Sequence, residues 1–277
     1  MLKRVTLAAA VALLLALAAI VPMPAARAAD KQYQLCDPMV SRMCAGLVAL
    51  YEFEEDADYA RMSETGGSSL LEPAGVNVIR YDNGTLTTGT FDVVMTQGQY
   101  LYIPRTASLG GEFTANVWVE FASDPATGDL VLATRDTNGT NANGIGGKVY
   151  WITTSGDVRP NFKVLQNVTD TGTNVQWSAD VSNGAWHLLS FGEYPSPTTS
   201  EPYQWTIWIS VDAGTRVTAT ITWPPKVFIG DLRLTAASVT TNYDQLSVYS
   251  RTLSAADLTW LYNSRAGRPY PFTENPF

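Results

Sequence analysis

Apolar and polar residues alternate along several short segments of the chain, which is the period of a β-strand whose successive side chains point to opposite faces. In the segment 113–121 every second residue is apolar, and Trp118 is the one large apolar side chain on the other face. The segment 203–212 has the same pattern, with Trp208 on its polar face. Both segments are therefore predicted to be strands with one buried face.

Short segments rich in glycine, asparagine, serine and proline separate these runs, as is typical of antiparallel hairpins. Residues 155–157 and 213–214 are predicted turns, in which Gly156 and Gly214 are expected to supply a positive φ. The segment 138–147 is expected to be an exposed loop. The pattern predicts an all-β fold, an antiparallel β-sandwich of two sheets.

One helix is predicted near the C-terminus. Ser254 is placed to cap its first turn, and Asp257 completes a capping box. Leu253 and Leu258 have the spacing of a hydrophobic staple, and Asn263 marks the expected end of the helix. We expect this short helix to cover one end of the sandwich.

The N-terminus has two basic residues, an apolar run over 7–21 and an Ala-Arg-Ala motif, which together predict a signal peptide over residues 1–28. The apolar run is shorter than the ~20 residues that a membrane-spanning helix needs. We expect an exported protein, secreted, at the cell surface or in the periplasm, without membrane insertion. An N-terminal segment over 29–45 and one domain over 46–277 follow.

The charge and the cysteines narrow the range of partners. The formal net charge is −8, which disfavours nucleic acid and anionic membranes as partners. Cys36 and Cys44 are the only cysteines, and in an oxidising compartment they are predicted to form a local disulfide. The single histidine, His187, lies far from them in the sequence, so a metal site of soft ligands is not expected.

A series of short motifs runs in order from residue 46 to residue 267. They are the opening run 46–53, a Phe-Thr and Trp-Val run over 113–119, Trp-His at 186–187, a Val-Asp hairpin over 211–214 in which Ala213 precedes the glycine, Ile-Gly at 229–230, Tyr-x-Arg-x-Leu-Ser over 249–254 and Leu-Tyr-Asn over 261–263. Together these motifs resemble the laminin-G-like jelly rolls of the concanavalin A-like lectin/glucanase superfamily. The resemblance implies a jelly-roll sandwich and leaves the function open, because this fold hosts lectins, hydrolases, adhesion modules and virion proteins.

The resemblance bears on catalysis, because the hydrolases of this superfamily carry acidic residues at alternate positions of a central strand. Glu52, Glu54 and Asp56 have that spacing, but they lie on the opening strand instead. His187 has no nucleophile or orienting acid next to it in the sequence. We therefore expect no catalytic residues, with a glycoside hydrolase of the same fold as the least favoured alternative.

Tryptophan side chains are the candidate ligand-binding residues, because the C–H groups of a sugar ring stack on an indole face. Trp118 and Trp208 lie on otherwise polar strand faces, and Trp151 is a weaker candidate near a predicted loop. The alternative is that other parts of the chain cover these rings. A carbohydrate or surface glycan is the expected partner, and the competing hypothesis is a self-assembling surface or virion component that contacts protein.

Calcium is the candidate cofactor, because sandwiches of this type often use this ion to join loops and it takes six or more oxygen ligands. The resemblance suggests an aspartate after the opening strand, Asp56 or Asp58, and a second one, Asp244, on the closing strand. The favoured interpretation of these carboxylates is that they are solvated at strand ends. The sequence thus predicts an exported, non-catalytic, lectin-like binding protein.

Overall fold

The computed structural model of the chain describes part of its 277 residues. These are residues 38, 41–51, 72–74, 80–82, 92–95, 100–103, 112–121, 123–135, 146–165, 172–196, 204–222, 231–235 and 238–268. All of them belong to one compact unit, Gln34–Phe277. The predicted signal peptide lies outside the described residues, as do Cys36, Glu52, Glu54, Asp56 and Asp58.

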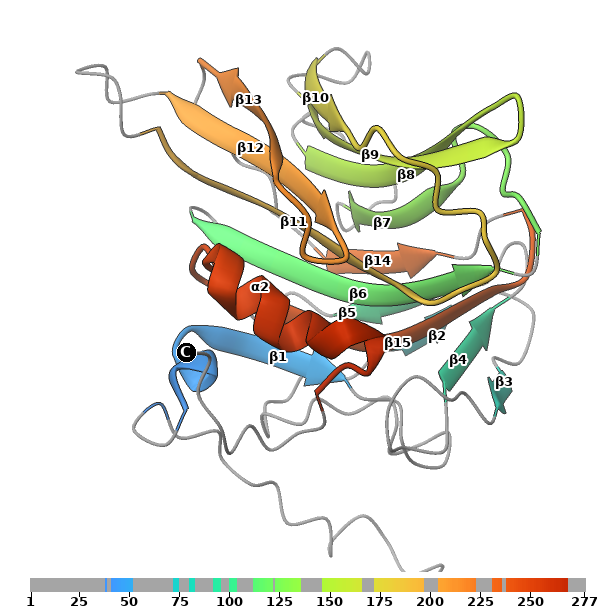
Figure 1. Cartoon of the computed structure of the whole chain (residues 1–277), viewed down its shortest axis with the longest axis horizontal. Helices are drawn as coiled ribbons and strands as arrows, with labels where there is room; N and C mark the ends of the chain where they lie inside the picture. The colour runs from blue at the N-terminus through green and yellow to red at the C-terminus, as the bar shows by residue number, and fades with distance from the viewer. Residues whose placement is uncertain are drawn as a thin grey trace, which may run out of the picture. The chain divides into compact units, whose positions relative to one another are not determined.

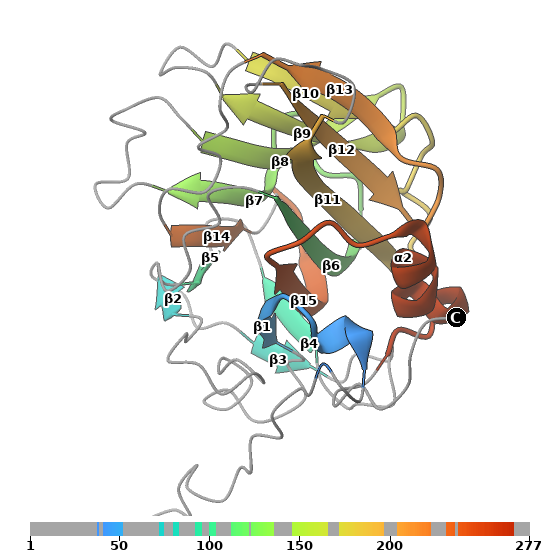
Figure 2. The same ribbon diagram turned by 90° about the vertical axis from the view of Figure 1, so that its left-hand side faces the viewer.

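The described strands form two antiparallel sheets (Figures 1 and 2). The first contains, in order, β13 (Val217–Ile221), β12 (Trp205–Val211), β11 (His187–Pro195), β6 (Phe113–Phe121), β15 (Thr241–Tyr249), β4 (Asp92–Met95) and β3 (Arg80–Asp82), and β1 (Leu47–Tyr51) also pairs with β15. The second contains β10 (Gly172–Gln176), β9 (Asp157–Leu165), β8 (Gly146–Thr154), β7 (Leu130–Arg135), β14 (Asp231–Thr235), β5 (Tyr100–Ile103) and β2 (Glu72–Ala74). The predicted all-β sandwich is confirmed.

The main core lies between the two sheets and is built from the alternating apolar positions. Phe191 of β11 contacts Phe162 of β9 with ring centroids 5.1 Å apart, so these two rings join one sheet to the other. Phe121 of β6 and Trp151 of β8 form a second such pair, with centroids 5.3 Å apart. The predicted strand over 113–121 coincides with β6, because its inward side chains are all apolar.

A second, smaller core lies on the outer face of the first sheet, beneath the helix α2 (Ala255–Tyr262). The sheet contributes Leu50, Trp118, Leu188, Trp208 and Tyr249, the helix and its approach contribute Leu253, Leu258, Trp260 and Leu261, and the N-terminal segment contributes Met43 and Cys44. The expectation that the helix covers an end of the sandwich is therefore wrong, because it covers a sheet face (Figure 1).

The start and the end of α2 agree with the sequence. The backbone N–H of Asp257 donates to Ser254 Oγ at 3.1 Å, and the N–H of Ser254 donates to Asp257 Oδ2 at 2.8 Å. The predicted capping box is thus confirmed. The helix ends at Asn263, whose φ of 45° is left-handed, and the short 3₁₀ helix η3 (Asn263–Arg265) follows.

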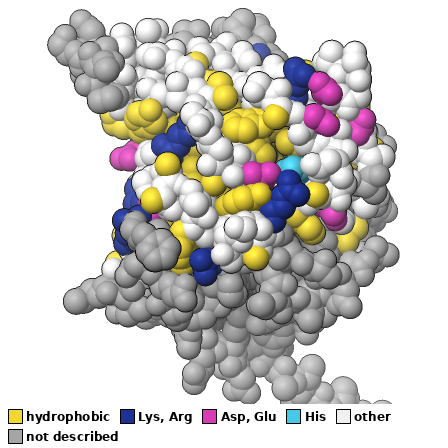
Figure 3. All heavy atoms as spheres, viewed as in Figure 1, with side chains coloured by type: hydrophobic (Ala, Val, Ile, Leu, Met, Phe, Trp, Pro, Cys, Tyr) yellow, Lys and Arg dark blue, Asp and Glu magenta, His cyan; other side chains and the backbone are white. Residues whose placement is uncertain are grey.

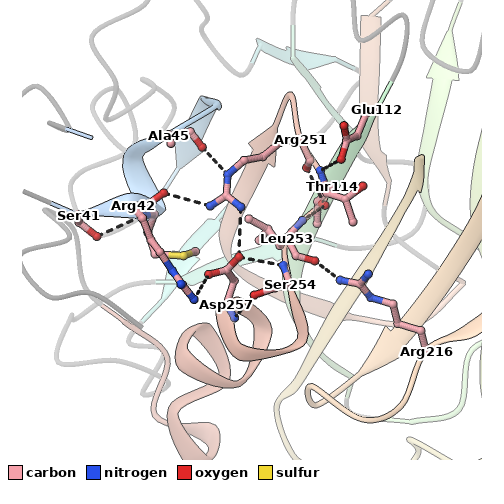
Figure 4. A network of polar contacts seen from close by, with 12 residues as sticks. Ser41, Arg42, Ala45, Glu112, Thr114, Arg216, Arg251, Leu253, Ser254 and Asp257 are labelled. Atoms are coloured by element: carbon pink, nitrogen blue, oxygen red, sulfur yellow. Dashed lines mark hydrogen bonds and ion pairs between the residues drawn. The ribbon is translucent and has the colours of Figure 1, made fainter. Parts of the chain in front are cut away.

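Arg251 holds the N-terminal segment against the start of α2 (Figure 4). Its guanidinium donates to the Ala45 carbonyl at 2.6 Å, to the Arg42 carbonyl at 3.1 Å and to Asp257 Oδ2 at 3.1 Å. Arg42 pairs in turn with Asp257 Oδ1 at 2.9 Å. The arginine of the Tyr-x-Arg-x-Leu-Ser motif therefore fixes where α2 begins on the sheet.

The two predicted turns form, but their glycines act differently. Between β8 and β9, Ser155 and Gly156 have φ of 55° and 90°, as expected for a two-residue hairpin turn. Between β12 and β13 the positive φ belongs to Asp212 and Ala213, so the expectation for Gly214 is wrong. A Cβ on Gly214 would lie 2.7 Å from the Trp177 ring, so this glycine is needed for close packing.

Candidate functional site

A hollow lies between the β12–β13 turn and the C-terminal half of α2, and we call it the α2 hollow. It encloses about 740 Å³ and is lined by Asp212, Ala213, Ala256, Thr259, Trp260, Tyr262, Asn263, Ser264 and Arg268. Figure 3 shows this face of the molecule, with acidic, basic and hydrophobic side chains gathered around the single histidine. The α2 hollow thus combines aromatic rings with charged and amide groups, as small-molecule sites do.

Left-handed backbone forms both walls of the α2 hollow. Asp212 and Ala213 have φ of 52° and 56° in one wall. Asn263 and Ser264 have φ of 45° and 55° in the other. Left-handed backbone costs a non-glycine residue roughly 1–2 kcal/mol. Residues that persist in such conformations cluster at ligand sites, where the surrounding structure holds them.

Asp212 is the most firmly held charge at the α2 hollow. Its Oδ1 accepts a hydrogen bond from the backbone N–H of Leu188 at 3.0 Å, and its Oδ2 lies 2.7 Å from His187 Nδ1. Arg265 Nη2 lies 3.9 Å from the same Oδ2. The carboxylate is therefore fixed in place by neighbouring donors, with Arg265 as a nearby cation, and it can accept hydrogen bonds from a ligand.

The geometry around His187 bears on the catalytic alternative. The sequence offers no orienting acid next to this histidine, but the pairing of β11 with β12 supplies Asp212. The other ring nitrogen, Nε2, lies 3.0 Å from Asn183 Oδ1, and the residue is only 5% exposed. Both ring nitrogens are thus engaged within the protein.

Two aromatic side chains form the floor of the α2 hollow on the helix side. Tyr262 accepts a hydrogen bond at its hydroxyl from Arg265 Nε at 3.2 Å. The guanidinium of Arg268 lies 4.9 Å from the centre of the Trp260 ring, and its Nε donates to the Trp260 carbonyl at 3.2 Å. Each ring therefore carries a cation beside it, which holds the ring and the arginine together.

The three tryptophans predicted to bind a ligand are all in the interior. Trp118, Trp208 and Trp151 are 1%, 0% and 1% exposed, so their rings are not open to a sugar. The helix α2 covers Trp118 and Trp208, and the guanidinium of Arg216 lies 3.9 Å above the Trp208 ring. Trp151 belongs to the main core between the sheets. Other parts of the chain thus cover these three rings, as the alternative interpretation expects.

The residues of the α2 hollow were not among the candidates from the sequence. Trp260, Tyr262 and Asn263 lie in or beside the Leu-Tyr-Asn motif, which in the sequence indicates only the family resemblance and the end of the helix. Asp212 belongs to the Val-Asp hairpin motif, which in the sequence indicates only the family resemblance and a turn. Both motifs contain polar or aromatic side chains that can contact a ligand, and this is the signal that the sequence offers. The sequence does not show that the two motifs lie close together in the fold.

The predicted calcium ligands are only partly visible. Asp244 is buried on β15, and its Oδ1 accepts a hydrogen bond from the Gln245 N–H at 2.7 Å. Asp56 and Asp58 lie outside the described residues. Within the described part of the chain, no group of three or more potential ligand side chains is placed to hold a metal ion. The calcium site stays a prediction.

The predicted disulfide is also only partly visible. Cys44 is buried in the small core beneath α2, and no free cysteine occurs in the described part of the chain. Its predicted partner, Cys36, lies outside that part, so the pairing stays a prediction.

Glu193 is a buried acidic residue that the sequence pattern did not single out. It lies on β11, paired in register with Phe113 and Ile207, whose side chains belong to the main core. Neither carboxyl oxygen has a hydrogen-bond partner. Burial raises the pKa of Glu193 to about 9, so the side chain is neutral at pH 7. It affects the stability of the fold and lies apart from the residues that line the α2 hollow.

No family model matches the chain, and no curated protein matches its sequence. The fold is similar to that of the binding domain of botulinum neurotoxin DC in complex with SialylT, with a TM-score of 0.56 and 12% identity over 79% of this chain and 52% of that one. It is also similar to the same domain in complex with rat synaptotagmin II, with a TM-score of 0.57 and 11% identity over 79% of this chain and 52% of that one.

A third similar structure belongs to botulinum neurotoxin type C, whose cell entry is dependent upon interaction with two ganglioside molecules. Its TM-score is 0.57, with 12% identity over 79% of this chain and 51% of that one. The chain thus matches about half the length of each of these structures. At such identities the likeness concerns the fold alone, which is a β-sandwich of the jelly-roll type related to lectin-like folds. In the described part of the chain, no helix has the length and apolar character needed to cross a membrane.

Proposed function

We propose that the protein is an exported, non-catalytic carbohydrate-binding or adhesive module of the laminin-G-like, concanavalin A-like type, and that the α2 hollow is its ligand site. The observation that carries this proposal is the pairing of the aromatic ring of Tyr262 with the fixed carboxylate of Asp212 and the amide of Asn263 in one hollow. A sugar needs both, since its C–H face packs on rings while its hydroxyls need directed polar groups.

The two walls are suited to hydroxyl groups in complementary ways. Asp212 accepts hydrogen bonds from ligand hydroxyls, and because its position is fixed, little entropy is lost on binding. Asn263 and Ser264 supply an amide and a hydroxyl from the opposite wall. The similar neurotoxin domains support a binding role, because one was solved with SialylT and another belongs to a toxin that depends on gangliosides for cell entry.

A glycan array tests the proposal with the mature chain. We expect the native protein to bind a subset of glycans and Asp212→Asn, which keeps the shape but removes the charge, to bind them at least about tenfold more weakly. Thr218→Ala is the matched control, because Thr218 is exposed on β13 and does not line the α2 hollow. It should bind like the native protein.

Other results would favour the alternatives. A folded protein that binds no glycan and forms concentration-dependent oligomers in light scattering would support the self-assembling surface component. Release of reducing sugar from a polysaccharide, abolished by Glu54→Gln, would support the glycoside hydrolase and contradict the non-catalytic assignment.

A further inference from the structure

The two sheets end in edge strands of two different kinds. At one end of each sheet the edge strand carries charges or a proline, since β3 contains Arg80 and Asp82 and β2 contains Glu72 and Pro73. At the other end, β13 and β10 contain neither a charged residue nor a proline. Charges and prolines on edge strands prevent pairing with other chains. Among the edges that the structure describes, β13 and β10 therefore lack this protection.

The two unprotected edges lie on the same side of the sandwich. β10 and β13 contact each other, and both views show them side by side near the top (Figures 1 and 2). Within the described strands, β13 pairs only with β12, and β10 pairs only with β9. Backbone N–H and C=O groups on the other side of such a strand point away from the sheet. This side of the protein thus presents hydrogen-bonding groups from both sheets.

The sequence of β13 (Val217–Ile221) is complementary to a second copy of itself. A two-fold axis at Ala219 pairs two β13 strands antiparallel, so that Thr218 of one copy lies opposite Thr220 of the other. Both threonines are exposed, and threonine pairs are favourable across neighbouring strands. No charged residue within the strand meets another.

Arg216 is the charged residue next to β13, and its charge lies away from the edge. Its guanidinium lies 3.9 Å from the centre of the Trp208 ring, and its Nη2 donates to the Leu253 carbonyl. Trp208 belongs to the small core on the outer face of the first sheet. The side chain of Arg216 is therefore held on that face and does not block a strand that pairs with β13.

We propose that the protein forms a weak two-fold dimer in which β13 pairs antiparallel with β13 of a second copy. The first sheet continues from one copy into the other, so the two-fold axis is perpendicular to that sheet. Because β10 lies beside β13, the β10 strands of the two copies also approach each other. The paired strand has five residues, so the contact is smaller than that of a permanent dimer and the two copies exchange with monomer.

The net charge of the protein opposes this dimer at low salt. Each copy carries a formal charge of −8, so two copies repel each other, and dissolved salt screens that repulsion. A neutral strand is where two acidic copies can approach at the lowest cost. The dimer is therefore tighter at higher ionic strength, which is the opposite of a contact held by ion pairs.

The dimer also determines how the α2 hollow meets a ligand, and this part rests on the proposed function. The helix α2 lies on the outer face of the first sheet (Figure 1). A two-fold axis perpendicular to the sheet keeps the outer faces of both copies on the same side. Both α2 hollows therefore face the same surface, and a dimer bound through two glycans dissociates more slowly than a monomer bound through one.

Sedimentation velocity of the mature chain tests the dimer without any ligand. We expect the native protein to change from monomer to dimer between about 1 and 100 μM, with an affinity at least about threefold higher in 300 mM than in 20 mM NaCl. Thr220→Glu adds a charge to the exposed face of β13 and should dimerise at least about tenfold more weakly. Thr218→Ala leaves the edge neutral and should dimerise like the native protein.

A matched variant controls for the added charge. Thr240 is exposed next to β15, four strands away from β13, so Thr240→Glu adds the same charge elsewhere and should dimerise like the native protein. A native protein that stays monomeric at about 100 μM in both salt concentrations would overturn the dimer. So would native assemblies larger than a dimer, because the two-fold contact closes on itself. Equal dimerisation of Thr220→Glu and Thr240→Glu would show that β13 is not the contact.

Two binding measurements test the bivalent arrangement. For a soluble glycan with one binding unit, chosen from the array, the native protein and Thr220→Glu should have equal affinity. On a surface densely coated with the same glycan, the native protein should dissociate about tenfold more slowly than Thr220→Glu. Equal dissociation rates on that surface would contradict the bivalent arrangement.

The dimer and the proposed function can fail separately. A native protein that dimerises but binds no glycan contradicts the proposed function and leaves the dimer standing. A native protein that binds glycans but stays monomeric contradicts the dimer and leaves the proposed function standing.

Discussion

The ring of Tyr262, on α2, stacks on the ring of Trp118, on β6, with centroids 5.8 Å apart and planes 18° apart. This contact joins the helix to the outer face of the first sheet. It also links the buried core beneath α2 to the α2 hollow, because Tyr262 lines the α2 hollow as well. The tryptophan that looks like an exposed sugar platform in the sequence thus supports the surface that the helix presents.

Removing the indole of Trp118 should lower the stability of the fold, because the ring packs inside the protein and does not contact a ligand. We expect Trp118→Ala to lower the free energy of unfolding by about 3–5 kcal/mol, because the residue is buried and nothing fills the space. Urea unfolding followed by circular dichroism measures the change. Tyr262→Phe keeps the stacked ring and should cost less than about 1.5 kcal/mol. A Trp118→Ala protein of native stability that had lost only glycan binding would show that the ring acts as a ligand platform.

The sequence predicts local features well because local rules govern them. The strand β6 follows from strict alternation, and the start of α2 follows from Ser254 and Asp257, which lie three residues apart. It places Trp118 and Trp208 on the outer face of the sheet correctly, but no local signal says that α2 covers that face. A polar strand face with a tryptophan fits an exposed platform and a helix-covered patch equally well.

The α2 hollow is harder to predict for a related reason. His187 and Asp212 are brought together by the antiparallel register of β11 and β12, in which Leu189 pairs with Val211. That register depends on the length of the intervening segment and on side-chain packing, neither of which a motif encodes.

The helix cap should make the protein sensitive to acid. Burial alone would raise the pKa of Asp257, but hydrogen bonds from the Ser254 N–H and from Arg251 hold that pKa below its usual value. The stabilisation is therefore present at neutral pH and is lost as the pH falls below about 4 and through the folded-state pKa. We expect Asp257→Asn to cost about 2 kcal/mol at pH 7 and progressively less in acid, measured by urea unfolding.

A carboxylate without such partners provides the control for this prediction. Asp124 is exposed, and Asp124→Asn should change the unfolding free energy by less than about 0.5 kcal/mol at either pH. If Asp257→Asn costs the same in acid as at neutral pH, its effect comes from packing and not from the ionised cap.

We propose calcium as a stabilising ion, and its removal is a direct test. An ion that binds only the native chain raises Tm, so about 1 mM calcium should raise Tm relative to EDTA-treated protein. Asp244→Asn should abolish that rise, because Asp244 is the predicted ligand on the closing strand. Scanning calorimetry measures both effects. An identical Tm with calcium and with EDTA would contradict the calcium prediction, and the glycan array repeated with EDTA would show whether binding depends on the ion.

The buried carboxyl of Glu193 should make the fold less stable as the pH rises. Its pKa is raised to about 9 by burial, whereas the unfolded chain has the ordinary value of 4.5, so between these values the folded state keeps a proton that the unfolded state releases. The free energy of unfolding then falls by up to about 1.4 kcal/mol per pH unit, or roughly 3 kcal/mol by pH 7. Glu193→Gln cannot ionise, so it should match the native protein near pH 4 and exceed its stability by a growing margin from pH 6 to pH 9. Urea unfolding across this range measures how the free energy of unfolding of each protein changes with pH. The control variant Asp124→Asn should keep the pH dependence of the native protein. An equal pH dependence in Glu193→Gln and the native protein would show that Glu193 ionises normally in the folded state.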